Sequence, residues 1–299
     1  MMFKLKVFLP SQKKFIYVKE LNYKTYRNLV KSLYVGDSLK TIELFNFILQ
    51  DIVEKNDLIN LSILDKLAIF LTVRDVCVSP DLSLKCTCPD TNTEFNFQIS
   101  INDIQATLNE LNTEVIAKTE GLITKHNLYP KIEEEAIIHA QKKHNNISYT
   151  IIELVTNKSI NLIDYKLEER KNITEQLPAK HLQEVYKQFE AARKQNTEKN
   201  LIKIVSPFTQ KELFKITGNL TSNGLSALLE YLFIEELNNV YKAMYNIVTH
   251  CKFSAEYVDS ITPAEIQVYW GYFLEESNKK NNNSTRGAST STPSGEFGF

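Results

Sequence analysis

Glycine is scarce in this 299-residue sequence, which contains only eight scattered glycines. The motifs Gly-x-Gly-x-x-Gly, Gly-x-x-x-x-Gly-Lys and Gly-x-Ser-x-Gly are all absent from it. Loops that cradle phosphate groups and turns that expose a nucleophilic serine depend on glycines at these spacings. The sequence therefore gives no support to the common nucleotide-binding and hydrolase classes. We expect a protein that is not an enzyme and that carries no cofactor.

Cysteine is also rare, and the chain contains Cys77, Cys86, Cys88 and Cys251. So few thiols do not build the disulfide framework of a secreted scaffold. The first ten residues interleave Lys4 and Lys6 with a short apolar run and lack the continuous apolar core of a signal peptide. These features predict a protein of a reducing, intracellular compartment.

The sequence has no excess charge and no long apolar run. Lysine and arginine number 35 and aspartate and glutamate 36, a balance that gives no general attraction to nucleic acid or to anionic membranes. The most apolar stretch, Leu225–Val248, is interrupted by Glu230, Glu235, Glu236 and Lys242. A membrane-spanning helix needs ~20 consecutive apolar residues. We expect neither a membrane span nor a nucleic-acid partner.

Apolar residues make up 43% of the chain, enough for most of it to fold around a large core. Apolar residues at spacings of three and four, as in Tyr23, Tyr26, Val30 and Leu33, dominate the sequence, and short alternating runs lie between the helical stretches. The pattern predicts an α+β fold that is predominantly helical. Its N-terminal helical unit contains a short strand pair and a β-hairpin, and its C-terminal half is helical.

The N-terminal unit is predicted to span residues 1–112. Its expected elements are a strand pair within Phe3–Val18 that turns at Pro10-Ser11, helices starting at Tyr23, near Asp37 or Ser38, after Ser62 and at Ser100, and a hairpin at about 82–99. Ser62 and Asp65 have the spacing of a capping box. These signals set element boundaries and leave tertiary contacts open.

The rest of the chain is predicted as a mixed or helical middle region at 113–200, a C-terminal strand pair with long helices at 201–280, and a flexible tail at 281–299. The expected elements are a strand-like run at Ser148–Val155, a helix starting at Pro178, strands at Leu201–Val205 and Leu213–Ile216, one long helix at about 223–251, and a last helix from Thr262-Pro263 to about Ser277. The tail is rich in Asn, Ser, Thr and Gly and has too little apolar area to fold alone.

Cys86 and Cys88 form the main candidate metal site, because residues two apart on a strand point the same way and thiolates bind zinc. Structural zinc sites need a second ligand pair at suitable spacing, so buried hairpin cysteines are the favoured interpretation. A zinc-bearing regulatory module or metal-dependent enzyme built on this hairpin is the alternative. Glu135 and His139, four residues apart, are more typical of a solvated helix than of an acid–base pair.

The aromatic run Tyr269, Trp270, Tyr272 and Phe273 spreads rings around more than one side of the last predicted helix. At least one ring should therefore leave the apolar stripe, and protruding aromatic residues often anchor interfaces. Burial of all four rings in a C-terminal core is the favoured interpretation, with an interface role as the alternative. We retain these residues as interface candidates.

The opening segments Phe8-Leu9-Pro10-Ser11, Val18–Lys24 and Tyr26-Arg27-Asn28-Leu29 are the most specific motif of the chain. They resemble the baseplate hub and hub-assembly family of T4-like phages with contractile tails, most clearly over about residues 1–110. In that family a short strand pair leads into the same Tyr-Arg-Asn-Leu helix, followed by further helices and a hairpin.

The resemblance implies a non-enzymatic hub subunit or hub-assembly factor in tail morphogenesis. Its expected partners are other hub, spike or tape-measure proteins, and further copies of the chain are possible partners as well. The expected locations are the host cytoplasm during assembly and the baseplate of the virion tail. Lys19, Arg27 and Lys31 are the positions of the motif expected to face a partner.

Overall fold

Helices account for most of the described residues and antiparallel strands for most of the rest, which confirms the predicted α+β, helix-rich class. The computed structural model describes residues 4–35, 38–58, 61–129, 148–154, 156–162, 165–220, 222–233, 235 and 237–286. The helices are α1 (Tyr23–Val35), α2 (Ser38–Ile52), α3 (Lys55–Leu58), α4 (Ile63–Cys77), α5 (Ile101–Asn109), α7 (Leu167–Glu175), α8 (Ala179–Glu198), α9 (Ser222–Phe233), α10 (Leu237–His250), α11 (Ala255–Ser260) and α12 (Pro263–Arg286).

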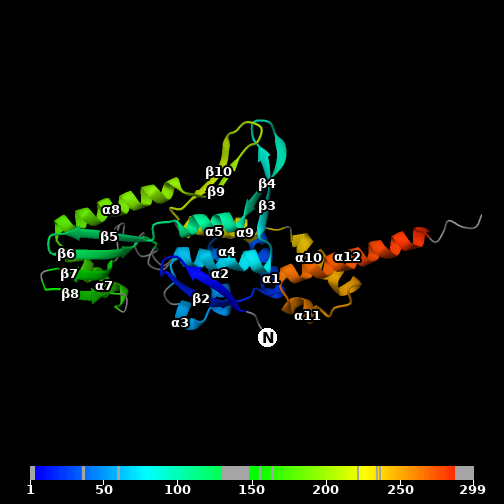
Figure 1. Cartoon of the computed structure of the whole chain (residues 1–299), viewed down its shortest axis with the longest axis horizontal. Coiled ribbons are helices and arrows are strands. Elements are labelled where there is room, and N and C mark those ends of the chain that lie inside the picture. The colour runs from blue at the N-terminus through cyan, green and yellow to red at the C-terminus, as the bar shows by residue number, and fades with distance from the viewer. Residues whose placement is uncertain are drawn as a thin grey trace, which may run out of the picture.

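The strands form three separate two-stranded hairpins and one four-stranded sheet. The hairpins are β1 (Lys4–Leu9) with β2 (Lys14–Lys19), β3 (Asp81–Cys88) with β4 (Thr93–Ser100), and β9 (Asn200–Val205) with β10 (Glu212–Thr217), and the sheet contains β5 (Glu114–Thr119), β6 (Leu122–Asn127), β7 (Ser148–Glu153) and β8 (Lys158–Asn161) in that order. The β3–β4 and β9–β10 hairpins project together from the helical body, and we call them the arm (Figure 1). The sheet and α8, which packs on β5, form a lobe on another side (Figure 1).

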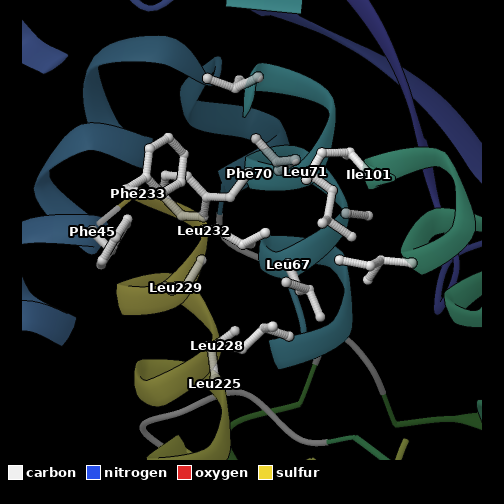
Figure 2. Close-up of a cluster of buried hydrophobic side chains, with 14 of the residues drawn as sticks. Phe45, Leu67, Phe70, Leu71, Ile101, Leu225, Leu228, Leu229, Leu232 and Phe233 are labelled. Atoms are coloured by element: carbon white, nitrogen blue, oxygen red, sulfur yellow. The ribbon is translucent and has the colours of Figure 1, made fainter. Parts of the chain in front are cut away.

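Helix α4 is the centre of the helical body, and twelve of its fifteen residues are buried, on every side of its first two turns. A helix that is apolar all round has to be covered by other elements. Helices α5, α9 and α12 and strand β1 provide this cover. Figure 2 shows leucines of α9 facing α4 beside a cluster formed by the rings of Phe45, Phe70 and Phe233. The Phe45 and Phe70 rings meet edge to face with 4.8 Å between centroids.

Arg74 of α4 fixes the end of α9. Its Nε donates to the carbonyl of Leu232 at 2.7 Å, and its Nη1 donates to the carbonyl of Ser79 at 2.8 Å. The last carbonyls of a helix lack partners within the helix, so the guanidinium satisfies one of them at this buried site. Tyr26 of α1 donates to the Glu235 carboxylate just after this helix end. The stretch predicted as one helix at about 223–251 is therefore divided into α9 and α10.

Asp65 attaches the β1–β2 hairpin to the start of α4. Its carboxylate accepts from the amide of Ser11 at 3.0 Å, from the Ser11 hydroxyl, and from the amide and hydroxyl of Ser62 at 3.1 and 3.0 Å. The predicted capping box of Ser62 and Asp65 is confirmed. Asp65 is completely buried and also holds the tip of the N-terminal hairpin through Ser11.

Asn196 near the end of α8 connects the lobe to the helical body. Its side chain exchanges two 2.9 Å hydrogen bonds with the backbone of Asn112 and donates to the Tyr129 hydroxyl at 2.7 Å. Tyr129 in turn donates to the carbonyl of Gly218 at 2.5 Å. A Cβ atom at Gly218 would lie 2.3 Å from a methyl carbon of Leu111, so this close approach requires glycine.

Several boundaries differ from the sequence prediction. Helix α12 continues to Arg286, so Asn281–Arg286 are helical although a flexible tail was predicted from residue 281. No glycine or proline interrupts Ser277–Arg286, and the helix can therefore continue through these polar residues. The remaining tail residues, 287–299, lie outside the described part of the chain. Within the run predicted as strand-like at 148–155, residues Ser148–Glu153 form β7, and residue 155 lies outside the described part of the chain.

The predicted N-terminal unit, 1–112, and the predicted C-terminal unit, 201–280, share one core. Helix α9 of the second unit packs on α2 and α4 of the first, and β9 packs on α5. Among the described residues, none of the helices combines the length and the apolar composition that a bilayer span requires.

Replacing Asp65 by alanine is expected to lower the free energy of unfolding by about 3 kcal/mol, because it removes a cap and leaves buried Ser62 and Ser11 donors unsatisfied. Urea unfolding followed by circular dichroism measures the change. The matched control Asp51→Ala removes an exposed carboxylate from α2 and is expected to shift stability by less than about 0.5 kcal/mol. Equal effects of the two substitutions would contradict the role assigned to Asp65.

Candidate protein-interaction surface

Helix α1, which carries the motif of the N-terminal segment, packs against the C-terminal helices. Tyr23 donates its amide to the carbonyl of Ile261 at 2.7 Å and its hydroxyl to the carbonyl of Val240 at 2.5 Å. Burial raises the pKa of the Tyr23 hydroxyl, so this donor keeps its proton. Helix α1 is thus joined to the C-terminal helices by buried hydrogen bonds.

Arg27, a predicted interface residue, is engaged within the chain. Its guanidinium forms a two-pronged ion pair with Asp259 of α11, with nitrogen–oxygen distances of 2.7 and 3.2 Å. One of these nitrogens also lies 2.8 Å from the sulfur of Met244 on α10. Bidentate pairs of this kind fix orientation as well as contributing energy. Arg27 therefore positions the α10–α11 pair on α1.

The other two basic candidates lie on exposed positions. Lys19 ends β2 and donates to the carbonyl of Asp51 at 2.9 Å, and Lys31 lies on the exposed face of α1. On the same face of the hairpin as Lys19, the rings of Phe15 and Tyr17 are 56% and 54% exposed. The β1–β2 hairpin therefore presents aromatic and basic side chains together.

Three rings of the predicted aromatic run lie in the packing of α12, and the fourth does not. Trp270 and Phe273 stack with centroids 5.1 Å apart, and both contact the ring of His250 at the end of α10. Tyr269 packs edge to face on Phe253 at 4.9 Å. Tyr272 is 61% exposed, so one ring does leave the packed stripe.

Sequence reasoning missed further exposed apolar side chains on the same helices. Tyr241 and Tyr245, four residues apart on α10, and Val268 and Leu274 on α12 are all exposed. The signal is weak in sequence, because each residue also fits the broad apolar stripe of its helix. We call Tyr241, Tyr245, His250, Val268, Trp270, Tyr272, Phe273 and Leu274 the C-terminal aromatic surface. Trp270 and Phe273 are half-buried in it, and Val268 and Tyr272 lie on the opposite side of α12 from them. Exposed apolar groups on neighbouring helices are typical of protein interaction sites.

The candidate metal pair is split between two environments. Cys86 is half-buried in the β3–β4 hairpin, and burial raises the pKa of its thiol. Cys88 lies buried at the tip of the arm against Ser206. Cys77 is buried elsewhere, beside the amide of Leu21. In the part of the chain that the structure describes, no three His, Cys, Asp or Glu residues come together in a way that suits a metal ion.

Two histidines that lie far apart in the sequence, His126 and His181, are joined in the lobe. The Thr124 hydroxyl of β6 lies 2.7 Å from Nε2 of His126 and 2.7 Å from Nε2 of His181 on α8, and Thr119 lies 2.7 Å from Nδ1 of His181. Both rings and Thr124 are almost completely buried. No substrate reaches such a cluster without opening α8 from the sheet, so we interpret it as a structural network. Glu135 and His139 lie outside the described residues.

The His181 network predicts a stability that depends on pH. Burial lowers the pKa of His181, so the folded state favours the neutral ring. The stability that the neutral His181 ring contributes is fully present above the unfolded-state pKa of about 6.5. It is lost as the pH falls from there toward the lower pKa of the folded state. His181→Gln is expected to lose about 1–2 kcal/mol at pH 7.5 and to show a smaller further loss at pH 5 than the wild type. Urea titrations at both pH values test this, and parallel losses would contradict it.

A double-mutant cycle tests the role of Arg27. Arg27→Met combined with Asp259→Asn is expected to give a coupling energy of about 1–2 kcal/mol, since the pair is bidentate and mostly shielded. The exposed Lys199–Glu110 pair is the matched control and is expected to give less than about 0.5 kcal/mol. A coupling energy no larger than that of the control would show that Arg27 does not position the C-terminal helices.

A family model described as T4 bacteriophage base plate protein matches residues 2–219 of the chain. No curated protein and no solved structure matches it. The matched segment runs from the β1–β2 hairpin through the arm and the lobe, and the helices that follow β10 lie beyond it.

Proposed function

We propose that this chain, which belongs to the family of T4 bacteriophage base plate proteins, is a component of the baseplate hub or a factor that assembles it, and that it acts through non-catalytic contacts with other tail proteins. The observation that carries the proposal is the C-terminal aromatic surface, a group of exposed and half-buried apolar side chains on α10, which packs on α1, and on α12, which packs on α10. Rigid aromatic side chains lose little entropy on binding and dominate interface energies.

The composition of this surface suits a protein partner. Tyrosine and tryptophan are enriched at interaction hot spots, and the surface contains Trp270, Tyr272 and two exposed tyrosines of α10. Exposed Glu275, Glu276 and Lys279 lie on the next turns of α12 and provide a charged rim. Figure 1 shows this end of α12 extending beyond the other helices, where a neighbouring subunit has access to it.

The extent of the family match suggests that different parts of the chain have different roles. Residues 2–219 supply the part common to base plate proteins, whereas the C-terminal aromatic surface lies on α10 and α12 beyond this match. We therefore assign partner choice to α10–α12 and the shared baseplate role to the remainder. The expected partners are hub, spike or tape-measure proteins, or further copies of this chain. They would be met in the host cytoplasm during assembly and in the virion baseplate.

Affinity purification from infected cells tests this proposal. The tagged wild-type chain is expected to recover tail proteins, and Val268→Asp with Tyr272→Asp is expected to reduce that recovery at least tenfold. Two carboxylates in an apolar contact cost more than about 1.4 kcal/mol, which corresponds to a tenfold loss of affinity. Tyr186→Asp is the matched control, because this exposed tyrosine lies on α8, away from the surface.

If the wild type recovers no tail protein, the proposed function is wrong. If the Val268→Asp, Tyr272→Asp variant recovers as much tail protein as the Tyr186→Asp control, the C-terminal aromatic surface is not the binding site. Mass spectrometry of purified virions then separates the two versions of the role, since a hub subunit stays in the particle and a transient assembly factor does not.

A further inference from the structure

Three hairpins of this chain close with the same turn. The turns are Leu9-Pro10-Ser11-Gln12-Lys13, Cys88-Pro89-Asp90-Thr91-Asn92 and Ser206-Pro207-Phe208-Thr209-Gln210. In each, the amide of the fifth residue donates to the carbonyl of the first, at 2.8, 2.8 and 2.9 Å. The fifth residue has a positive φ in each turn, with values of 51, 53 and 59°. The backbone of the three tips is therefore equivalent, and they differ in the side chains that they present.

The second and third turns meet at the end of the arm. The Ser206 hydroxyl donates to the sulfur of Cys88 at 3.2 Å, and the Thr209 hydroxyl lies 3.9 Å from the same sulfur. A salt bridge of 3.2 Å between Lys211 and Asp90 lies beside this contact. Two segments far apart in sequence are thus joined tip to tip around one thiol.

The residues that meet occupy matching positions. Cys88 and Thr91 are the first and fourth residues of one turn, and Ser206 and Thr209 are the first and fourth of the other. The side chain of Thr91 also hydrogen-bonds to Cys88. Zinc knuckles place thiols at the first and fourth positions of two such turns, the Cys-x-x-Cys pattern. The four matching positions of the arm therefore have the spacing of the ligands in a pair of zinc knuckles, but only one of them, Cys88, is a cysteine.

Backbone amides point at the first residue of each turn in the same way. The amides of Phe208 and Thr209 donate to the Ser206 hydroxyl, both at 3.3 Å, and those of Asp90 and Thr91 donate to the sulfur of Cys88. Hydrogen bonds from the Ser206 and Thr91 side chains, together with these amides, lower the pKa of the Cys88 thiol to about 6. Both tips are built to stabilise negative charge on their first side chain.

The distances also suit a tetrahedral ion. Zinc–sulfur bonds of about 2.3 Å in a tetrahedron place the thiolates about 3.8 Å apart. The Cys88 sulfur lies 3.2 Å from the Ser206 hydroxyl oxygen and 3.9 Å from the Thr209 hydroxyl oxygen, and these two distances lie on either side of that value. The β1–β2 turn shows that the backbone alone is not sufficient, because its first residue is Leu9, which is buried in the core.

We propose that the arm is a zinc-knuckle pair in which hydroxyl groups occupy three of the four ligand positions, so that hydrogen bonds to Cys88 join the two hairpins without a metal. Neutral hydroxyls are poor ligands for zinc, which takes thiolate, imidazole or carboxylate groups. The ligand that the geometry accepts, once thiols replace Thr91, Ser206 and Thr209, is a divalent ion with tetrahedral thiolate coordination. This inference does not depend on the proposed baseplate role.

The test uses the full chain under reducing conditions with the substitutions Thr91→Cys, Ser206→Cys and Thr209→Cys. The variant is expected to bind one cobalt(II) ion with the charge-transfer and d–d absorption of a tetrathiolate site, to retain stoichiometric zinc, and to show a higher Tm with zinc than without it. The matched control carries Ser83→Cys, Thr87→Cys and Lys215→Cys, three exposed positions on the same hairpins, and is expected to show none of these effects.

A folded triple variant that binds no more cobalt than the control overturns the proposed geometry. Stoichiometric zinc in the wild type, lost in Cys88→Ser, overturns the metal-free part of the proposal. If the triple variant does not fold, Ser206→Cys with Thr209→Cys replaces it. This double variant is expected to give a three-thiolate cobalt spectrum that Cys88→Ser removes, and absence of that spectrum also overturns the proposal.

Discussion

The burial of α4 along most of its length is the constraint on which the rest of this structure depends. A helix that is apolar on every side cannot be stable until other elements surround it, and here β1 comes from before it, α5 from just after it, and α9 and α12 from the far end of the chain. The cost of burying Arg74 and Asp65 in that environment is offset because both are fully hydrogen-bonded. The N-terminal hairpin and the C-terminal helices take their places from these contacts.

The arm and the lobe extend from that centre by different means. The lobe is attached through Asn196 and Tyr129, whose hydrogen bonds are neutral and buried. The base of the arm is part of the core, and its tips are joined around Cys88. Hydrogen bonds to a thiolate are stronger than those to a neutral thiol. Hydrogen bonds to the single thiol of Cys88 can therefore hold the two turns in the arrangement of a zinc site without a metal ion.

The distribution of chemistry fits a molecule that works through contacts. Its joined histidines are buried between α8 and the sheet, whereas Tyr241 and Tyr245 of α10 and Tyr272 of α12 are exposed. Buried titratable groups contribute to stability, and exposed rings on a rigid support are suited to binding. Membership of the base plate family and this arrangement support the same kind of role, in which shape and surface replace bond chemistry.

The sequence by itself determined the local elements, because caps, turns and helical periodicity act over a few residues: the Ser62–Asp65 box, the proline turns and the helix from Tyr23 were all readable from it. The spread of four rings around the last helix indicated that one could be exposed, although burial of all four was the favoured interpretation. Only the tertiary structure decided that Arg27 pairs with Asp259, that two histidines share Thr124, and that two turns 118 residues apart converge on Cys88. Those contacts join distant segments, and they depend on how the surrounding helices cover α4, which no local pattern encodes.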